Sequence, residues 1–394
     1  MTTPSFYQQT GLSITINEPL LAANRSASWN ARLTDQLDTF RMEKRRVGGY
    51  WSASAQITHR QDAIEDWIER GLGRHVQVQD EALVTVWEGF VNRIEATLGK
   101  LTFTLGPLMN IANRVQCVYS TVDNTTTPPT MGVRARTAAY NDADSQAAHG
   151  IVQRILSTGG STATEAAQNA QTYLAEHAWP ATGRRSTLMG GAAASMTIEM
   201  LGYWAWLGAY VYNQAVLSGA VDASVKLQAV LAASLNAGLF STDYSRLTAN
   251  AVQISQWEND DRTAEDLVKA LNALGTATYA TTNIGFYNNR QIIYEPAPTT
   301  IRYVQRVTSN DLLTDLIGGQ MRPWNVMPGE WIYYADFLVG RLPPATGAVI
   351  QRDPRCGLIE VVTLDNLYGL DVNGVHVGTL DQMLARQGLA GVGV

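Results

Sequence analysis

The sequence predicts an α+β fold that is mainly β, with two β-barrel or β-sandwich domains flanking a helix-rich middle region. Three observations support this prediction. The chain has 394 residues, more than one ordinary core accommodates, and 45% of them are apolar, as in folded globular proteins. Strand-like alternation dominates both ends of the chain, whereas helical periodicity is concentrated in the middle. We therefore expect domains over residues 1–112, 113–276 and 277–394.

The first region is predicted to consist of strands around one short helix. Helix Gln61–Arg70 is expected because Ile64, Trp67 and Ile68 share one face and Gly71 follows as a stop. Gly89 interrupts a long strand, which indicates a bulge or a crowded crossing. Strands of this length around one helix suggest a small closed or half-closed barrel. The predicted strands are Ser13–Asn17, Gly49–Thr58, His75–Gln79, Val84–Glu95 and Leu98–Leu105.

The middle region is predicted to be helical after a projecting segment. Thr121–Thr130 has two prolines and no apolar period, so we expect a loop or the tip of a projecting hairpin. Helix Thr263–Leu274 is the best marked, because Thr263 and Asp266 have capping-box spacing and Gly275 follows. Its apolar face is expected to hold Leu267, Ala270, Leu271 and Leu274. Apolar residues at helical spacing predict further helices over Ala143–Ser157, Ser161–His177 and Asp222–Leu235.

The most apolar segment is Met196–Val211. It is shorter than the ~20 residues that span a bilayer and contains Glu199, so we expect no membrane span here. Its alternating start predicts a buried strand or hairpin, in the core or at a subunit interface. The same alternation places Trp204 and Trp206 on one strand face, where they would fill a core.

The last region returns to strands. Tyr279–Tyr287 and Gln291–Glu295 flank Asn288 and Asn289, which tolerate the left-handed conformation that a tight hairpin requires. Further strands are expected over Thr299–Val307, Gly329–Val339 and Gly357–Leu364, followed by a short helix near Leu380–Gln387.

Composition excludes several classes of protein. Charged residues make up only 16% of the chain, and the net charge of −6 argues against a protein that holds nucleic acid through its phosphates. The 25 arginines far outnumber the four lysines and accompany 10 tryptophans and 16 tyrosines, which favours a subunit of an assembly. A GC-rich genome would raise the arginine content as well. Two cysteines and five scattered histidines form neither a disulfide framework nor a zinc site, and pairing of Cys117 with Cys356 stays open. The start of the chain lacks a signal-peptide pattern.

No catalytic motif is present. Walker, GxSxG, HExxH and GxGxxG patterns are absent, although spacing alone does not exclude a histidine-containing triad. Asp142–Gln146 begins like a calcium loop but lacks the required glycine, so it is interpreted as an acidic helix N-terminus. The densest carboxylate cluster is assigned to helix capping and the helix dipole, in preference to glycoside hydrolysis; it comprises Glu258, Asp260, Asp261, Glu265 and Asp266. We expect no catalytic, cofactor-binding or metal-binding residues.

Several segments follow an order shared with a known family. They are Gly49–Ala53 before a helix, Gly71–Arg74, Val86–Val91, Ser145–Gly150, Arg322–Trp324, Pro328–Trp331, Asp336–Phe337 and Asp353–Arg355. In this order they resemble the tail and baseplate hub proteins of tailed bacteriophages. The resemblance covers most of the chain, but it is one of pattern and order, and no single segment is a signature.

The resemblance implies a structural role. Such hubs contain a tail-tube-like fold twice, so that three copies match a hexameric tube, enclose the DNA channel and hold the spike or tip protein. A negative net charge suits a conduit, because DNA must pass without forming counterion-releasing contacts. A second copy of the tube motif cannot be located in the sequence, which leaves a hexameric ring as an alternative to the trimer.

We therefore expect a non-enzymatic structural virion protein without cofactor or metal. It would be the hub of the tail tip or baseplate, homotrimeric by preference and hexameric otherwise, assembled in the host cytoplasm. Its partners would be the tail tube or distal tail protein and the tip or spike protein, with DNA passing through the lumen without specific binding. The alternatives are a hexameric distal tail ring, a carbohydrate-binding tail protein and, as the weakest, a tail-associated cell-wall hydrolase. The binding protein would use Trp204 and Trp206 or Trp324 and Trp331, and the hydrolase Glu258 and Asp260.

Overall fold

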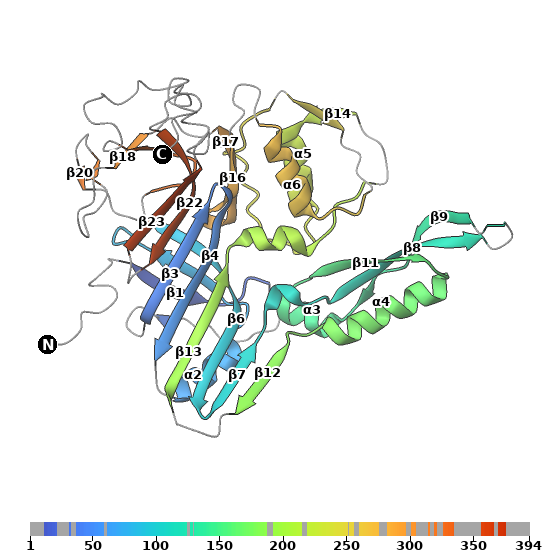
Figure 1. The fold of residues 1–394 in the computed structure, drawn as a ribbon, viewed down its shortest axis with the longest axis horizontal. Helices are drawn as coiled ribbons and strands as arrows, with labels where there is room; N and C mark the ends of the chain where they lie inside the picture. The colour runs from blue at the N-terminus through green and yellow to red at the C-terminus, as the bar shows by residue number, and fades with distance from the viewer. Residues whose placement is uncertain are drawn as a thin grey trace, which may run out of the picture.

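The computed structural model describes residues 12–21, 31–32, 37–58, 61–123, 127–128, 130–186, 192–214, 219–250, 252–255, 260–275, 282–296, 301–304, 314–315, 319–320, 326–334, 356–365 and 369–375. Mostly antiparallel strands form one large sheet and a smaller sheet that projects from it (Figure 1). The mainly β character predicted from the sequence is therefore confirmed.

The predicted barrel does not close within the described part of the chain. The large sheet is an open path that ends at β18 (Ile301–Val304) and β2 (Ala31–Arg32). Its centre is β13 (Ala192–Leu201), which lies antiparallel between β4 (Val47–Thr58) and β6 (Thr85–Gly99). Strand β13, from the middle of the sequence, thus separates β4 and β6, two strands of the first predicted region.

All three predicted regions contribute strands to this sheet, and the division into three domains stays a prediction. The late strand β22 (Cys356–Asp365) pairs with β3 (Leu37–Arg45), and β16 (Thr282–Tyr287) pairs with β4. The other strands of the sheet are β1 (Ser13–Asn17), β5 (His75–Gln79), β7 (Leu101–Leu105), β12 (Thr182–Ser186), β17 (Gln291–Pro296), β21 (Trp331–Tyr334) and β23 (Gly369–Val375). Two short pairs lie outside it, β14 (Ala220–Asp222) with β15 (Gln253–Ser255) and β19 (Thr314–Asp315) with β20 (Gly319–Gln320).

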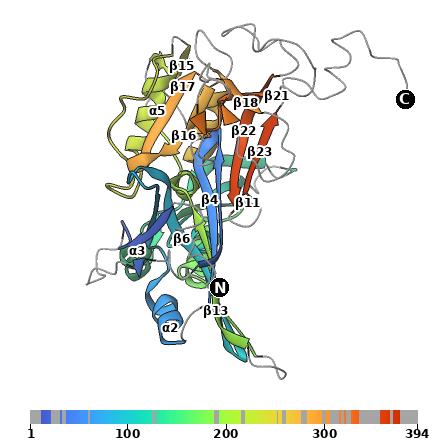
Figure 2. The ribbon, with the colours of Figure 1, turned by 90° about the vertical axis from the view of Figure 1, so that its left-hand side faces the viewer.

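One face of the large sheet is buried under helix α2 (Gln61–Arg70), whose bounds match the prediction. Figure 2 shows the central strands almost edge-on, with α2 to one side. Ile64 and Trp67 of α2 pack on alternate residues of the strands, because successive side chains of a strand point to opposite faces. The strand residues of this core include Phe40, Met42, Ala55, Ile57, Ile94, Ala96, Met196, Ile198 and Met200.

Gly89 lies at a crowded crossing, as the sequence predicts. A Cβ atom at this position would approach the carbonyl oxygen of Leu201 to 2.2 Å, so only glycine lets the two backbones come this close. Gly49 has a φ of +75° and lies against the backbone of Phe286 in the same way. These two crossings bring β6 onto β13 and β4 onto β16.

A second core forms around the segment after β13. Trp204 and Trp206 are both buried there, as predicted, but they lie on the 3₁₀ helix η2 (Tyr203–Ala209) and not on a strand. The amide of Gly202 donates to the carbonyl of Trp51, and the first 3₁₀ bond follows at once from Ala205 to Gly202. The helix η2 packs against α6 (Ala264–Ala273), which in turn contacts α5 (Ala223–Ala232).

Helix α6 begins at the predicted cap. The Thr263 side chain accepts a hydrogen bond from the Asp266 amide at 3.2 Å. Leu267 and Leu271 are buried as expected, but Ala270 and Leu274 are exposed, and Ala264 and Val268 complete the buried face. The buried face of α6 differs from the predicted one because the helix packs on both η2 and α5. The spacing of apolar residues in the sequence does not specify these two neighbours. Helix α5 ends at Ala232, three residues before the predicted Leu235, and buries Leu227, Val230 and Leu231.

The smaller sheet forms an arm that projects to the right in Figure 1. Strand β8 (Arg114–Asp123) pairs antiparallel with β9 (Thr130–Arg136), in agreement with the hairpin predicted around Thr121–Thr130. Strands β10 (Tyr140–Asn141) and β11 (Gln153–Gly160) complete the sheet. Helix α4 (Ala163–His177), predicted over Ser161–His177, packs on β8 through Ala166 and Ala170.

The helix predicted over Ala143–Ser157 is wrong in its second half. Helix α3 ends at His149, Gly150 follows with a φ of +78°, and β11 then runs parallel to β8. The apolar residues Ile151, Val152, Ile155 and Leu156 fit a helical face as well as a buried strand. The glycine and the β-branched residues after it decide in favour of the strand.

Hairpin β16–β17 is formed as predicted. Its connection is the short 3₁₀ turn η3 (Asn288–Arg290), in which Asn289 and Arg290 both have a φ of +58°. Parts of the predicted strands Thr299–Val307, Gly329–Val339 and Gly357–Leu364 appear as β18, β21 and β22. The predicted helix near Leu380–Gln387 lies outside the described residues. Within the described part of the chain, no helix is both long enough and apolar enough to cross a bilayer.

Candidate functional site

The face of the large sheet opposite α2 is polar across six strands, and we call it the polar sheet face. It is built by the alternation that buries the other face, since residues paired across strands point to the same side. Its three central rows contain no apolar side chain. They are Arg41–Ser54–Glu199–Arg93, Thr39–Gln56–Thr197–Glu95–Thr104–Gly183 and Thr58–Ser195–Thr97–Thr102–Arg185. The next row, Glu43–Ser52–Leu201, borders the face and includes an apolar residue.

Charges on the polar sheet face balance. Three arginines, Arg41, Arg93 and Arg185, stand beside three glutamates, Glu43, Glu95 and Glu199. Arg93 bridges two strands by pairing with Glu199 at 3.3 Å and Glu95 at 3.2 Å. A shallow hollow of about 320 Å³ lies over the same strands. The face therefore offers hydroxyls and charges of both signs to solvent, and within the described strands it has neither a deep pocket nor a field of one sign.

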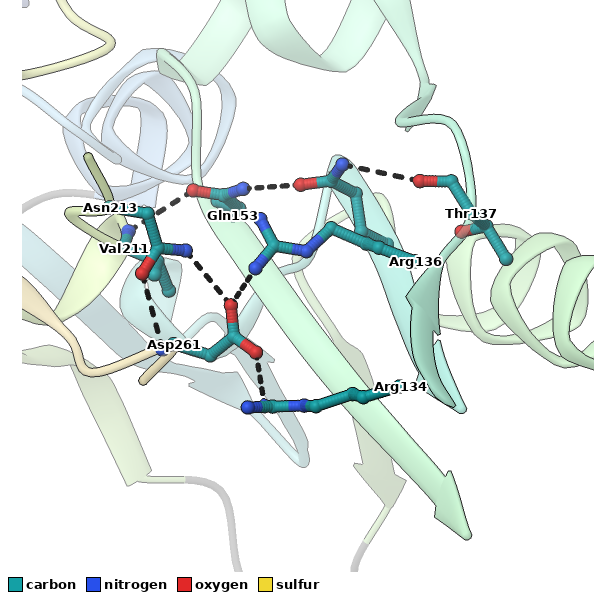
Figure 3. Close-up of polar contacts among 8 residues, drawn as sticks. Arg134, Arg136, Thr137, Gln153, Val211, Asn213 and Asp261 are labelled. Carbon is teal, nitrogen blue, oxygen red and sulfur yellow. Dashed lines mark hydrogen bonds and ion pairs between the residues drawn. The ribbon is translucent and has the colours of Figure 1, made fainter. Parts of the chain in front are cut away.

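A second polar site fastens the arm to the body of the protein (Figure 3). Asp261, which precedes α6, has a side chain that is only 9% exposed and pairs with both Arg134 and Arg136 of strand β9. Asn213 donates its side-chain amide to Asp261 Oδ1 at 2.9 Å and accepts the Asp261 backbone amide at 3.2 Å. One aspartate thus joins the edge strand of the arm to the segment that follows η2.

A chain of amide side chains continues this junction. Gln153 of β11 accepts the backbone amide of Val211 at 3.1 Å and donates to Gln116 of β8 at 3.0 Å. Gln116 donates in turn to the carbonyl of Thr137 at 3.4 Å. Arg154 reaches from the same strand to the carbonyls of Met109 and Gly208 (2.7 and 3.1 Å), and its burial lowers its pKa. The arm is held by several polar contacts in addition to its covalent connections.

A third cluster is buried where β6 meets the η3 turn. Glu88 is 2% exposed, and burial raises its pKa to about 7 although it accepts hydrogen bonds from the backbone amides of Asn289 and Arg290. Nearby, His75 Nδ1 lies 2.6 Å from the hydroxyl of Tyr203, and burial lowers the pKa of this histidine to about 4. The environment therefore favours a protonated carboxyl group next to a neutral imidazole.

The carboxylates singled out in the sequence do not converge on one site. Asp261 binds the arm, Asp266 belongs to the cap of α6, and Glu265 accepts the indole N–H of Trp204 at 3.0 Å and pairs with Lys269. Asp260 is exposed, and Glu258 lies outside the described residues. Each carboxylate that the structure describes in this cluster thus has a separate structural environment.

The other candidates are also placed. Asp142 caps α3 by accepting the Ser145 amide at 2.9 Å, as the helix interpretation predicts. Trp204 and Trp206 are buried and present no surface to a sugar, whereas Trp324 and the side chain of Trp331 lie outside the description. Cys117 is a buried free thiol in β8, and the side chain of Cys356 lies outside the description. Among the described residues, no group of three or more His, Cys, Asp or Glu could hold a metal ion.

The sequence analysis did not single out Glu88, and it assigned Asp261 only a favourable interaction with the dipole of the helix that follows it. A glutamate inside the apolar strand run Val86–Val91 is an available signal for the first, because a strand that is buried on both faces must bury its carboxylate. No local pattern could indicate the partners of Asp261, which lie about 125 residues earlier in the chain.

Comparisons with known proteins give one finding. No family model and no curated protein sequence matches the chain. Among solved structures, the chain is similar to a 43 kDa tail protein of prophage MuSo2 from Shewanella oneidensis, with 7% identity and a TM-score of 0.40. The match covers 92% of this chain and 95% of the other.

Proposed function

We propose that this protein is a non-enzymatic structural component of a bacteriophage tail, namely the hub that joins the tail tube to the tip or spike. The polar sheet face carries this proposal. We infer that it lines the passage through which DNA travels, in a ring of three copies that is assembled in the host cytoplasm and incorporated at the tail tip. The order of segments shared with tail hub proteins supports the same role.

The chemistry of the polar sheet face suits a conduit. A strongly basic lining would bind phosphates and release counterions, which would hold DNA in place. An apolar lining of comparable width would be an adhesive surface exposed to water. Hydroxyl groups and interspersed charges of both signs do neither, because water satisfies their hydrogen bonds and their net field is small.

The glycines in the resembling segments support the proposal at the level of the fold. Gly49 and Gly89 lie at the close backbone crossings described above, and Gly71 donates its amide to the carbonyl of Trp67 at 2.7 Å to end α2. They let β4 lie against β16 and β6 against β13, and they end α2 beneath the sheet. Such a face is useful to a ring only if every copy presents it to the same axis.

Native mass spectrometry and particle images of the purified chain test the proposal. A particle of three subunits with a central hole is expected, together with weak binding of double-stranded DNA that lacks a steep salt dependence. A six-subunit ring would move the assignment to a distal tail ring. A monomer that fails to assemble at any concentration, or one that binds DNA tightly in low salt, would refute the hub with its polar lumen.

A further inference from the structure

The arm sheet has one face under helix α4 and a second face that points away from this helix. Cys117 and Tyr119 of β8 pack against α4. Because successive side chains of a strand point to opposite faces, the residues that alternate with these two lie on the second face, and the register with β9 places residues of that strand beside them. We call this surface the open arm face. It comprises Val118, Ser120, Val122, Met131, Arg134 and Arg136.

The outer end of the open arm face exposes apolar side chains. Met131 is 61% exposed and Val122 is 39% exposed. Gly160 of β11 lies beneath both, because a Cβ atom at this glycine would come within 2.6 Å of Val122 and 3.5 Å of Met131. The three residues therefore form one continuous apolar surface on a projecting element. Contiguous apolar surface of this kind marks interaction sites, whereas single exposed apolar residues do not.

A hollow of about 240 Å³ lies on the same face, between the arm and the segment that precedes α6. A water molecule takes up about 30 Å³, so the hollow has room for a side chain of a partner. Val118, which is 5% exposed, provides an apolar wall. The charged residues of the lining are Arg134, Arg136 and Asp261.

The charges around this hollow do not balance. Arg134 donates to Asp261 Oδ2 and Arg136 donates to Asp261 Oδ1, so both carboxylate oxygens are engaged (Figure 3). A guanidinium group has five N–H donors, and within the described part of the chain these two groups make no other hydrogen bond. Asp260 and Arg262, on either side of Asp261 in the chain, have opposite charges. Two guanidinium groups against one carboxylate thus leave one net positive charge.

We propose that the open arm face is a docking site for an extended segment of another protein, in which an acidic side chain lies next to an apolar one. The carboxylate of the segment enters the hollow and accepts hydrogen bonds from the guanidinium N–H groups that Asp261 leaves unused. The apolar side chain covers Val122 and Met131. Charge complementarity selects an acidic partner, and the apolar surface favours a peptide over a nucleic acid, whose phosphates would leave Met131 uncovered. The site does not depend on the role in a phage tail.

Methyl NMR of the full chain, with isotope-labelled methionine, tests this proposal. The probe is a five-residue peptide, blocked at both ends, with one glutamate between two leucines. Its addition should move the methyl signal of Met131, which Met131→Leu identifies, until the signal saturates. The signal of Met200, which is buried in the core of the large sheet, should not move. The same peptide with glutamine in place of glutamate should bind about five-fold more weakly, because it loses an ion pair at a partly exposed site.

Variants show whether the guanidinium groups select the peptide. Arg134→Gln should weaken binding of the glutamate peptide about five-fold and should bind the glutamine peptide as the wild type does. Arg70→Gln is the matched control and should bind both peptides as the wild type does. Arg70 lies on α2, and its side chain is 54% exposed and paired with an aspartate, as is that of Arg134.

Four results would overturn the proposal. In the first, the Met131 signal does not move or does not saturate. In the second, the glutamine peptide binds the wild type as tightly as the glutamate peptide, which would leave only an unselective apolar surface. In the third, sodium acetate or a short DNA duplex alone gives the same response as the peptide at the same concentration. In the fourth, the Met131 signal changes with protein concentration in the absence of peptide, which would assign the face to contacts between copies of this chain.

Discussion

Replacing Glu88 by glutamine should change how the free energy of unfolding depends on pH, because Glu88 and His75 have opposite effects on that dependence. Burial raises the pKa of Glu88 from 4.5 to about 7 and lowers that of His75 from 6.5 to about 4. Each change is worth about 3 kcal/mol when fully expressed. Glu88 contributes stability that is fully present below pH 4.5 and is lost as the pH rises through 7. His75 contributes stability that is present above pH 6.5 and is lost as the pH falls through 4.

In the wild type the two contributions nearly cancel. Between about pH 4.5 and 6.5, global unfolding moves one proton from Glu88 to His75, so the pair changes the overall proton count very little. In Glu88→Gln only the histidine contribution remains. The free energy of unfolding of the variant, relative to the wild type, should therefore rise by about 2 kcal/mol between pH 5 and pH 7.5. His75→Asn should show a change of similar size and opposite sign.

Urea unfolding of the three proteins at a series of pH values measures this difference. Glu199→Gln provides the matched control, because the side chain of Glu199 is about half exposed and should give a nearly constant difference from the wild type. The reasoning would be refuted by a Glu88→Gln difference that does not vary between pH 5 and pH 7.5. A difference that falls with rising pH would refute it equally, since it would mean that Glu88 is better stabilised when charged.

Three further substitutions test the packing and the arm. Gly89→Ala should reduce the free energy of unfolding by at least about 2 kcal/mol in urea unfolding, because its new Cβ atom would overlap the carbonyl of Leu201. Gly183→Ala is the control: its Cβ atom would meet only Thr104 at 3.6 Å, so the free energy of unfolding should hardly change. Thr263→Ala removes the cap of α6 and should cost about 1 kcal/mol in the same assay, and no loss would contradict the capping role. Asp261→Asn should reduce the free energy of unfolding by about 1 kcal/mol. It should also increase hydrogen exchange or proteolysis of β9 without affecting α2. Equal protection of β9 in the variant and the wild type would show that the arm needs no such junction.

The sequence was sufficient wherever one short segment carries its own signal. Helix α2 has its predicted bounds because three apolar residues share a face and a glycine ends it. Hairpin β16–β17 follows from two asparagines at its turn, and the burial of Trp204 and Trp206 follows from the apolar segment around them. Local periodicity and turn chemistry act within a few residues, so they can be recognised without knowledge of the rest of the chain.

Tertiary structure alone decided the rest. Residues 153–157 are compatible with a helix or a strand, and pairing with β8 selects the strand. Within the described residues, β13 pairs with both β4 and β6, and nothing in the sequence of β13 indicates these neighbours. Asp261 acquires its role from two arginines on a distant strand. Burial raises the pKa of Glu88, and the backbone amides of a turn about 200 residues away offset this rise only in part. The sequence by itself determined the elements and which of their faces are apolar. Only the folded chain determined which faces meet, because burial and charge pairing depend on contacts that are remote in sequence.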